Sequence, residues 1–141
     1  MKDAINLVGK VEVLLNNKVV LEKNNLIVQV GKNFLASAVI NSSASPFVGM
    51  AIGTGTTAAS TSDTTLQTEV ARAAFTSSSV STNVVSLSNT YAAGTGTGAI
   101  TEAGIFNNAS SGGTMLSHVV FSAINKGSSD TLTINWTITV G

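Results

Sequence analysis

The stretch that decides the fold is the one that closes the sequence. It reads Thr131-Leu132-Thr133-Ile134-Asn135-Trp136-Thr137-Ile138-Thr139-Val140. Apolar and polar residues alternate along it, and successive side chains of a β-strand point to opposite faces of its sheet. The stretch therefore predicts a strand with one hydroxyl-rich face and one apolar face, which places Trp136 in the core. Because such a strand cannot bury its apolar face alone, a neighbouring sheet and a second layer are expected.

Alternating segments and turn signals divide the rest of the chain in the same way. Eight further strands are predicted at residues 5–15, 18–23, 26–30, 47–53, 72–81, 84–91, 100–106 and 114–124. Apolar residues at helical spacing predict one short helix at 32–41. This pattern favours an all-β fold, an antiparallel β-sandwich of jelly-roll-like type. A chain of 141 residues predicts a single domain, 1–141, with a hairpin and helix (1–45) packed on a sandwich (46–141).

The composition is poor in charge and rich in hydroxyl groups. Only 10% of the residues are charged, against a typical share of about 25%, and 36 are serine or threonine. The formal net charge is zero, which gives no basis for binding nucleic acid or an anionic membrane surface. Proteins with a net charge near zero tend to associate, so we expect much of the surface to face other subunits. The alternative is a free, threonine-rich monomer.

Several classes of protein find little support in the residues. There is no cysteine, so neither a disulfide framework nor a thiolate zinc site is possible. The polar start Met1-Lys2-Asp3 predicts no secretory signal peptide, and no apolar run approaches the ~20 residues of a membrane span. The glycine-threonine runs at 53–57 and 94–98 lack the lysine of a phosphate-binding loop, and are interpreted as turns.

His118 is the only histidine and the natural first candidate for catalysis or metal binding. A metal site needs several ligands, and the chain offers no cysteine and few carboxylates. No Gly-x-Ser-x-Gly segment of a hydrolase is present either. We therefore expect no catalytic, metal or cofactor site, and interpret His118 as a packed, hydrogen-bonded residue of the core or of an interface.

Arg72 and Glu102 form the more informative candidate pair. Arg72 is the only arginine, and Glu102 lies in the otherwise apolar segment Ile100-Thr101-Glu102-Ala103-Gly104-Ile105-Phe106, on the same parity as Ile100 and Phe106. A partly buried carboxylate requires a cation or hydrogen-bond donors. Arginine can supply a bidentate partner, so we hypothesise that the two form a structural ion pair, within the fold or across a subunit contact. The alternative is two unrelated exposed side chains.

Five segments together resemble a widespread set of small structural proteins of tailed bacteriophages. They are Met50-Ala51-Ile52-Gly53-Thr54-Gly55-Thr56-Thr57-Ala58, Asp63-Thr64-Thr65-Leu66-Gln67-Thr68-Glu69-Val70 with Arg72, Gly98-Ala99-Ile100-Thr101-Glu102-Ala103-Gly104-Ile105-Phe106-Asn107, Gly112-Gly113-Thr114-Met115-Leu116 and Asp130-Thr131-Leu132-Thr133-Ile134-Asn135-Trp136-Thr137-Ile138-Thr139. The resemblance covers roughly residues 3–140. It implies a virion protein, assembled in the bacterial cytoplasm, with no enzyme activity and no cofactor.

Within that group, the single compact domain without heptads or fibrous repeats favours a capsid decoration (cement) protein. Its expected partners are other virion proteins, a major capsid protein or tail proteins, and further copies of itself in a homo-oligomer such as a trimer. The alternatives are a tail or tail-fibre-associated protein and a carbohydrate-binding adhesin on the virion surface. The polar loop after residue 53, with Thr54, Thr56, Thr57 and Thr61, is the hypothesised subunit contact.

Overall fold

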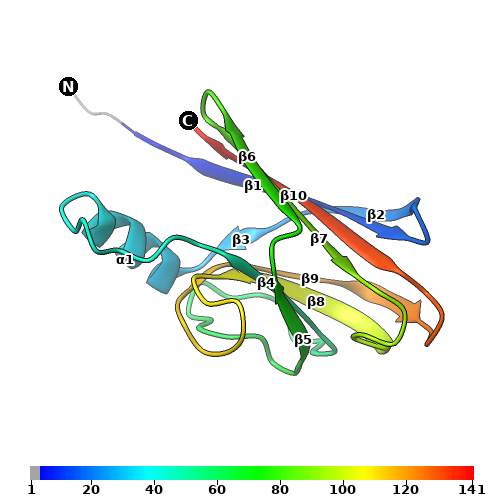
Figure 1. The fold of residues 1–141 in the computed structure, drawn as a ribbon. Coiled ribbons are helices and arrows are strands. Elements are labelled where there is room, and N and C mark those ends of the chain that lie inside the picture. The colour runs from blue at the N-terminus through cyan, green and yellow to red at the C-terminus, as the bar shows by residue number, and fades with distance from the viewer. Residues whose placement is uncertain (1–3) are drawn as a thin grey trace.

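The computed structural model describes residues 4–141, and over this range the chain forms ten strands and one helix (Figure 1). The elements are β1 (Leu7–Leu15), β2 (Lys18–Asn24), β3 (Leu26–Ile27), α1 (Gln29–Ala38), β4 (Gly49–Gly53), β5 (Glu69–Ala74), β6 (Ser77–Ser81), β7 (Val84–Tyr91), β8 (Gly98–Phe106), β9 (Met115–Lys126) and β10 (Leu132–Val140). No helix in this part of the chain has the length and apolar character that crossing a membrane requires.

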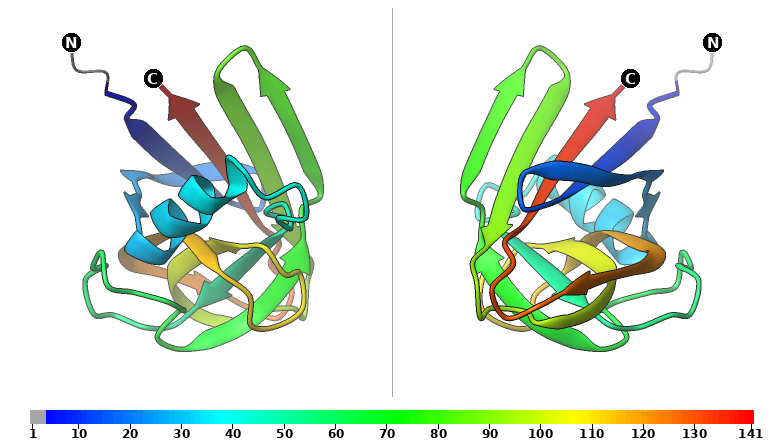
Figure 2. Two further views of the ribbon diagram at one scale, coloured as in Figure 1. Left: turned by 90° about the vertical axis from the view of Figure 1, so that its left-hand side faces the viewer. Right: turned by 90° about the vertical axis from the view of Figure 1, so that its right-hand side faces the viewer.

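The strands form two antiparallel sheets that lie face to face (Figure 2). Sheet A has the order β2-β1-β10-β7-β6, and sheet B has the order β3-β9-β8-β4-β5. The predicted all-β sandwich with one short helix is confirmed. The closing strand β10 is central in sheet A, where it pairs with β1 on one side and β7 on the other.

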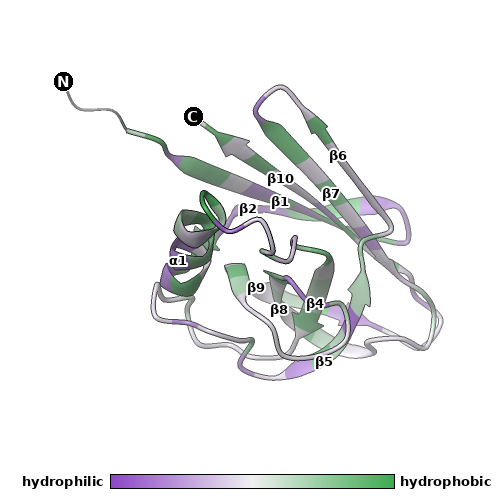
Figure 3. Ribbon diagram, turned by 60° about the vertical axis from the view of Figure 1, so that its left-hand side comes forward, coloured by the Kyte–Doolittle hydropathy of each residue, from purple (hydrophilic) through white to green (hydrophobic). Residues whose placement is uncertain are grey.

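The inner face of β10 is the centre of the core. Leu132, Ile134 and Trp136 are fully buried, and the predicted core position of Trp136 is confirmed. Val11 and Leu87 lie beside Trp136 on the neighbouring strands. Hydrophobic and hydrophilic residues alternate along the strands (Figure 3), as a sheet with one buried face requires. These side chains meet apolar residues of β4, β8 and β9 from sheet B.

Sheet B is covered on its outer face as well. A second apolar cluster lies there, made of Val28, Ala51, Leu66, Phe106 and Met115. Leu66 comes from the long connection between β4 and β5, and Val28 directly precedes α1. All five residues of β4 are therefore buried. The outer face of sheet B is a closed environment, and it holds the candidate site.

The predicted strand at 72–81 is wrong, because the chain changes sheets in its middle. Residues Glu69–Ala74 form β5 in sheet B, and Ser77–Ser81 form β6 in sheet A. At the crossing, the Phe75 N–H donates to the carbonyl of Val48, whereas the next N–H, that of Thr76, donates to Ser88. No glycine, proline, asparagine or aspartate marks a turn at this point, so the sequence alone did not show the break.

The N-terminal part of the chain belongs to the sandwich itself and is not packed on it. β1 pairs with β10 in sheet A, and β3 pairs with β9 in sheet B. The helix is confirmed but begins three residues earlier than predicted, at Gln29. Gly31 explains this start, since a Cβ there would lie 2.6 Å from the carbonyl oxygen of Leu116. Glycine lets the first turn of α1 rest on the backbone of β9.

Candidate functional site

The candidate site is a line of three ionisable side chains beneath the loop of residues 54–68, which connects β4 to β5. Glu102 comes from β8, His118 from β9 and Asp63 from the loop. In the register of the two strands, Glu102 lies opposite Val120 and His118 lies opposite Gly104. The two side chains are therefore diagonal neighbours on the outer face of sheet B. Both are completely buried, whereas the side chain of Asp63 is 21% exposed.

His118 bridges the two carboxylates. Its Nε2 lies 2.9 Å from Glu102 Oε1, and its Nδ1 lies 2.7 Å from Asp63 Oδ2. A neutral imidazole carries one N–H and can donate to only one of these oxygens. The imidazolium carries two N–H groups and can donate to both carboxylates.

Glu102 also accepts hydrogen bonds from three backbone N–H groups at the two ends of the loop. Gly55 donates to Oε2 at 2.7 Å and Thr68 donates to the same oxygen at 2.9 Å, while Gln67 donates to Oε1 at 3.0 Å. Next to it, the Thr101 hydroxyl donates to the carbonyl of Gly55 at 2.5 Å. The carboxylate therefore fastens the beginning of the loop to its end and both to β8.

Burial and hydrogen bonding shift the pKa of Glu102 in opposite directions. Burial is the largest single influence and acts to raise the pKa of this carboxyl group. The backbone donors of Thr68 and Gln67, the His118 ring and the Gly55 donor act in the opposite direction, and together they outweigh burial. The pKa of Glu102 is thus held below its ordinary value, and the group is ionised at neutral pH.

This depressed pKa predicts that the folded state is destabilised by acid. A carboxyl group whose pKa is lower in the folded chain stabilises it above the unfolded-state pKa, which is about 4.5 for glutamate, and loses this contribution as the pH falls through the folded-state value. We expect the free energy of unfolding to decrease below that pH in the wild type. In a Glu102→Gln variant the decrease should be smaller. Urea titrations at a series of pH values measure both, and parallel profiles would contradict the assignment.

Two glycines let the loop backbone reach the carboxylate. A Cβ on Gly53 would lie 2.8 Å from Glu102 Oε2 and would collide with the Thr68 carbonyl. A Cβ on Gly55 would collide with Glu102 Oε2 and with the side chain of Gln67. The predicted turn between strands is therefore also a close approach of backbone to a buried charge, which only glycine permits.

The geometry supports a structural role for the three residues. A catalytic histidine of the serine-hydrolase type presents one nitrogen to a carboxylate and the other to a nucleophilic hydroxyl. Here carboxylates occupy both nitrogens, and neither His118 nor Glu102 is exposed to a substrate. What the cluster does physically is hold the 54–68 loop against sheet B. The expectation that His118 is a packed, hydrogen-bonded residue is confirmed.

The hypothesised ion pair between Arg72 and Glu102 is wrong, because each of the two residues binds other partners. Arg72 instead binds Glu69 in a bidentate manner, with Nη2 2.7 Å from Oε1 and Nε 3.2 Å from Oε2. Its Nη1 donates to the carbonyls of Asn108 and Gly112, and its guanidinium lies 3.7 Å from the centre of the Phe106 ring. Glu102 is fully buried among loop donors, which rules out a pairing across a subunit contact as well.

The four hypothesised interface threonines all lie on the 54–68 loop. Thr54 is half-buried, and Thr56, Thr57 and Thr61 are exposed. The backbone of Thr57 exchanges two hydrogen bonds with the Gln67 side chain, and the carbonyl of Thr61 accepts from the N–H of Gln29 at the start of α1. The loop is thus well ordered, with exposed hydroxyls on a fixed frame. Its role as a subunit contact stays a prediction.

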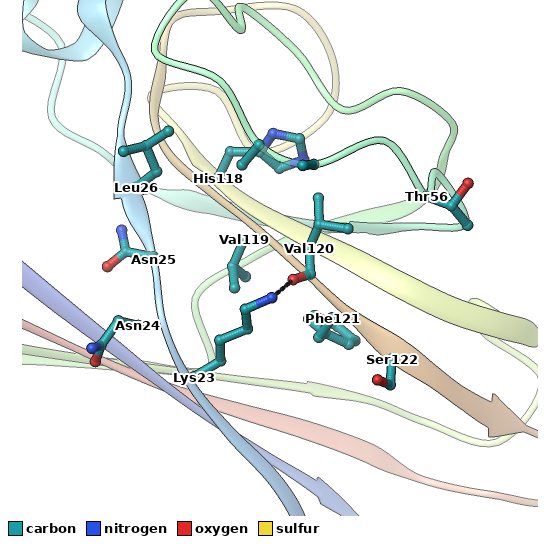
Figure 4. Close-up of a pocket in the computed structure, with 12 residues that line it drawn as sticks. Lys23, Asn24, Asn25, Leu26, Thr56, His118, Val119, Val120, Phe121 and Ser122 are labelled. Carbon is teal, nitrogen blue, oxygen red and sulfur yellow. Dashed lines mark hydrogen bonds between the residues drawn. The ribbon is translucent and has the colours of Figure 1, made fainter.

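A groove of about 590 Å³ opens beside the cluster (Figure 4). The turn between β2 and β3 forms one wall, the loop residues Thr56, Ala58 and Ala59 form another, and β9 is the floor. Figure 4 shows Lys23 reaching from β2 to donate to the carbonyl of Val120, which ties sheet A to sheet B at this edge. His118, on β9, also lines the groove, but its nitrogens point to carboxylates.

Over residues 4–141 there is no group of three or more histidine, aspartate and glutamate side chains arranged to hold a metal ion. Asp63, Glu102 and His118 bind one another in a line and do not converge on a common point. Compared with known proteins, the chain matches no family model, no curated sequence and no solved structure.

Proposed function

We propose that this chain is a non-enzymatic structural protein of a bacteriophage virion, and that it acts as a capsid decoration protein. The observation that supports this best is the distribution of charge. The buried ionisable side chains Glu102, His118, Lys126 and Arg72 are used for contacts within the chain. In contrast, residues 73–101 contain no charged residue at all, and they supply one edge of sheet A.

On the side of sheet A formed by β10, β7 and β6, the outer face is a surface of hydroxyl and amide groups, whereas β1 and β2 carry Lys10, Glu12 and Glu22 on the same face. A shallow trough of about 360 Å³ lies on it, and the side chains that line it include Ser77, Ser79, Ser86, Ser88, Asn135 and Thr137. Each hydrogen bond that such a face makes to a neighbour contributes only about 1 kcal/mol net. Repetition of weak contacts over a symmetric shell gives durable attachment, because multivalent binding multiplies them. The resemblance of residues 50–58 and 98–107 to phage structural proteins supports the same assignment.

The proposal predicts that the chain is an abundant component of the intact particle. Quantitative mass spectrometry of purified virions, normalised to the major capsid protein, should find it in a number comparable to that of the capsid subunit. Particles that lack the chain should bind the purified protein back and should release their DNA at a lower temperature without it. A high copy number with restored thermal stability is the expected result.

Other copy numbers separate the alternatives. A small number of copies confined to tail fractions would replace the decoration role with a tail or tail-fibre role. Binding of the purified chain to host-cell glycans, at a low copy number in the particle, would favour the adhesin. Absence from purified virions would overturn the proposal as a whole.

A further inference from the structure

The outer edge of sheet A is an open strand, β6. Ser77–Ser81 pair with Val84–Ser88 of β7 in an unbroken antiparallel register, and no strand in the described range pairs with the other side of β6. All five of its residues are exposed. Figure 2 shows the β6–β7 hairpin projecting beyond sheet B, with β6 outermost. Such an edge presents alternate backbone N–H and C=O groups that can bind a further strand.

The other three edges of the two sheets are protected, and β6 is not. Strand β2 carries Lys18, Glu22 and Lys23 and has an irregular register with β1. Strand β5 carries Glu69 and Arg72 and is irregular against β4. Strand β3 is only two residues long. Charges, irregular pairing and shortness are the usual means of preventing strand addition.

Strand β6 has none of these three features, since it is uncharged, regularly paired with β7 and five residues long. Its sequence is Ser77-Ser78-Ser79-Val80-Ser81, with neither charge nor proline, and in Figure 3 it is pale along most of its length and green toward its end. An edge that is regular, neutral and fully exposed fits a partner that is itself an uncharged extended strand, since such a strand completes the hydrogen bonds without burying a charge.

We propose that this partner is β6 of a second copy, and that the two strands pair antiparallel about Ser79 to join two A sheets into one. Antiparallel self-pairing centred on Ser79 overlaps the whole strand and places Ser77 opposite Ser81 of the other copy. It brings no like charges together within the paired strands, because β6 carries no charged residue. The pairing itself does not depend on the proposed function. Only the role of this dimer as the building unit of the virion assembly rests on it.

Val80 gives the pairing an apolar component. It lies opposite Val85 and is 69% exposed, which is unusual for a residue on the core-facing side of its sheet. Val85 and Val140 line a small apolar cavity of about 180 Å³ where the sheets separate. In the proposed pair, Val80 of one copy is a diagonal neighbour of Val80 of the other, within reach for side-chain contact. Dimer formation therefore covers a side chain that the monomer leaves in water.

The oligomeric state in solution tests the inference. The full chain should show a concentration-dependent monomer–dimer equilibrium by analytical ultracentrifugation. Ser79→Lys places like charges opposite each other at the centre of the pair, and should raise the dissociation constant roughly tenfold or more. Val20→Lys is the matched control, because Val20 is an exposed residue of the protected edge strand β2, and it should leave the equilibrium unchanged. Unfolding curves of both variants verify that they fold.

Disulfide cross-linking tests the register of the two β6 strands. Because the chain has no cysteine, an introduced cysteine is the only thiol that can react. Oxidation of a Ser79→Cys variant should give a covalent dimer, because directly opposed residues have Cβ atoms about 4.5–5.5 Å apart. A mixture of Ser77→Cys and Ser81→Cys chains should cross-link as the mixed dimer more than either variant alone. Val20→Cys should not cross-link above background.

A chain that stays monomeric at every concentration would overturn the inference, as would a dimer that Ser79→Lys does not weaken. Neither result bears on whether the chain is present in virions. Conversely, a dimer that behaves as described while virions lack the chain would overturn the proposed function and leave the β6 interface intact. The two failures are therefore distinguishable.

Discussion

Replacing Glu102 with glutamine is expected to lower the free energy of unfolding by about 3–5 kcal/mol, the usual cost of removing one partner from a buried charged pair. Each carboxylate oxygen accepts two hydrogen bonds, Oε2 from Gly55 and Thr68 and Oε1 from Gln67 and His118. The glutamine amide has almost the same shape but one NH₂ group in place of an oxygen. Whichever way it turns, two buried donors lose their acceptor.

Urea-induced unfolding of the wild type and the variant at neutral pH measures this cost. Glu22→Gln is the control, because Glu22 makes a 3.8 Å ion pair with Lys10 in which both side chains are more than half exposed. Exposed pairs of this kind contribute little, so the control should differ from the wild type by no more than about 0.5–1 kcal/mol. If Glu102→Gln cost no more than Glu22→Gln, the carboxylate would not be the fastening point of the loop.

Alternation of apolar and polar residues was sufficient to predict the sandwich, because sheet A buries one face and its central strands β1, β10 and β7 alternate accordingly. It placed β10 and β7 within one residue of their observed ends. It failed where the chain exchanges one sheet for the other, at Phe75 and Thr76, because both halves of that segment have a strand-like pattern. A change of sheet depends on partners far away in the sequence, and no local signal marks it.

The site was predicted only in part, for a related reason. The sequence indicated that Glu102 is buried in an apolar strand and needs donors, and that His118 is packed and hydrogen-bonded. It did not indicate that they bind each other, since 16 residues separate them and their contact depends on the register of β8 and β9. That register is irregular between Ile100 and Glu102, which places Ile100 in the core between the sheets, although its parity groups it with Glu102.

A signal for the site was nevertheless present in the glycine-threonine run after β4. Glycines spaced two apart at the end of a buried strand indicate a backbone that approaches something closely. The run lacks the lysine of a phosphate-binding loop. Here the negative group that the backbone N–H of Gly55 meets is supplied by the protein's own Glu102. The same physical principle, backbone donors around an anion, serves to fix a loop.

Gly55 lies where the 54–68 loop meets the buried carboxylate of Glu102. Replacing Gly55 with alanine is expected to lower the free energy of unfolding by about 2–4 kcal/mol, comparable to an overpacked core with a lost buried hydrogen bond. The added methyl group collides with Glu102 Oε2 and with the Gln67 side chain, so the Gly55 N–H can no longer reach the carboxylate. Gly127→Ala is the control, because Gly127 is exposed and its nearest neighbour is the side chain of Asp130 at 3.1 Å.

The double variant Gly55→Ala/Glu102→Gln distinguishes this mechanism from a general loss of packing. If both substitutions act by detaching the 54–68 loop from sheet B, the second has little left to disrupt once the first has acted. The double variant should then cost clearly less than the sum of the two single variants, with a coupling energy of about 1–3 kcal/mol from the double-mutant cycle. Additive costs would mean that Gly55 and Glu102 stabilise the fold independently, and that the carboxylate does not organise the loop. Hydrogen exchange gives a second measurement, since the N–H groups of Gly55, Gln67 and Thr68 should lose protection together in either single variant.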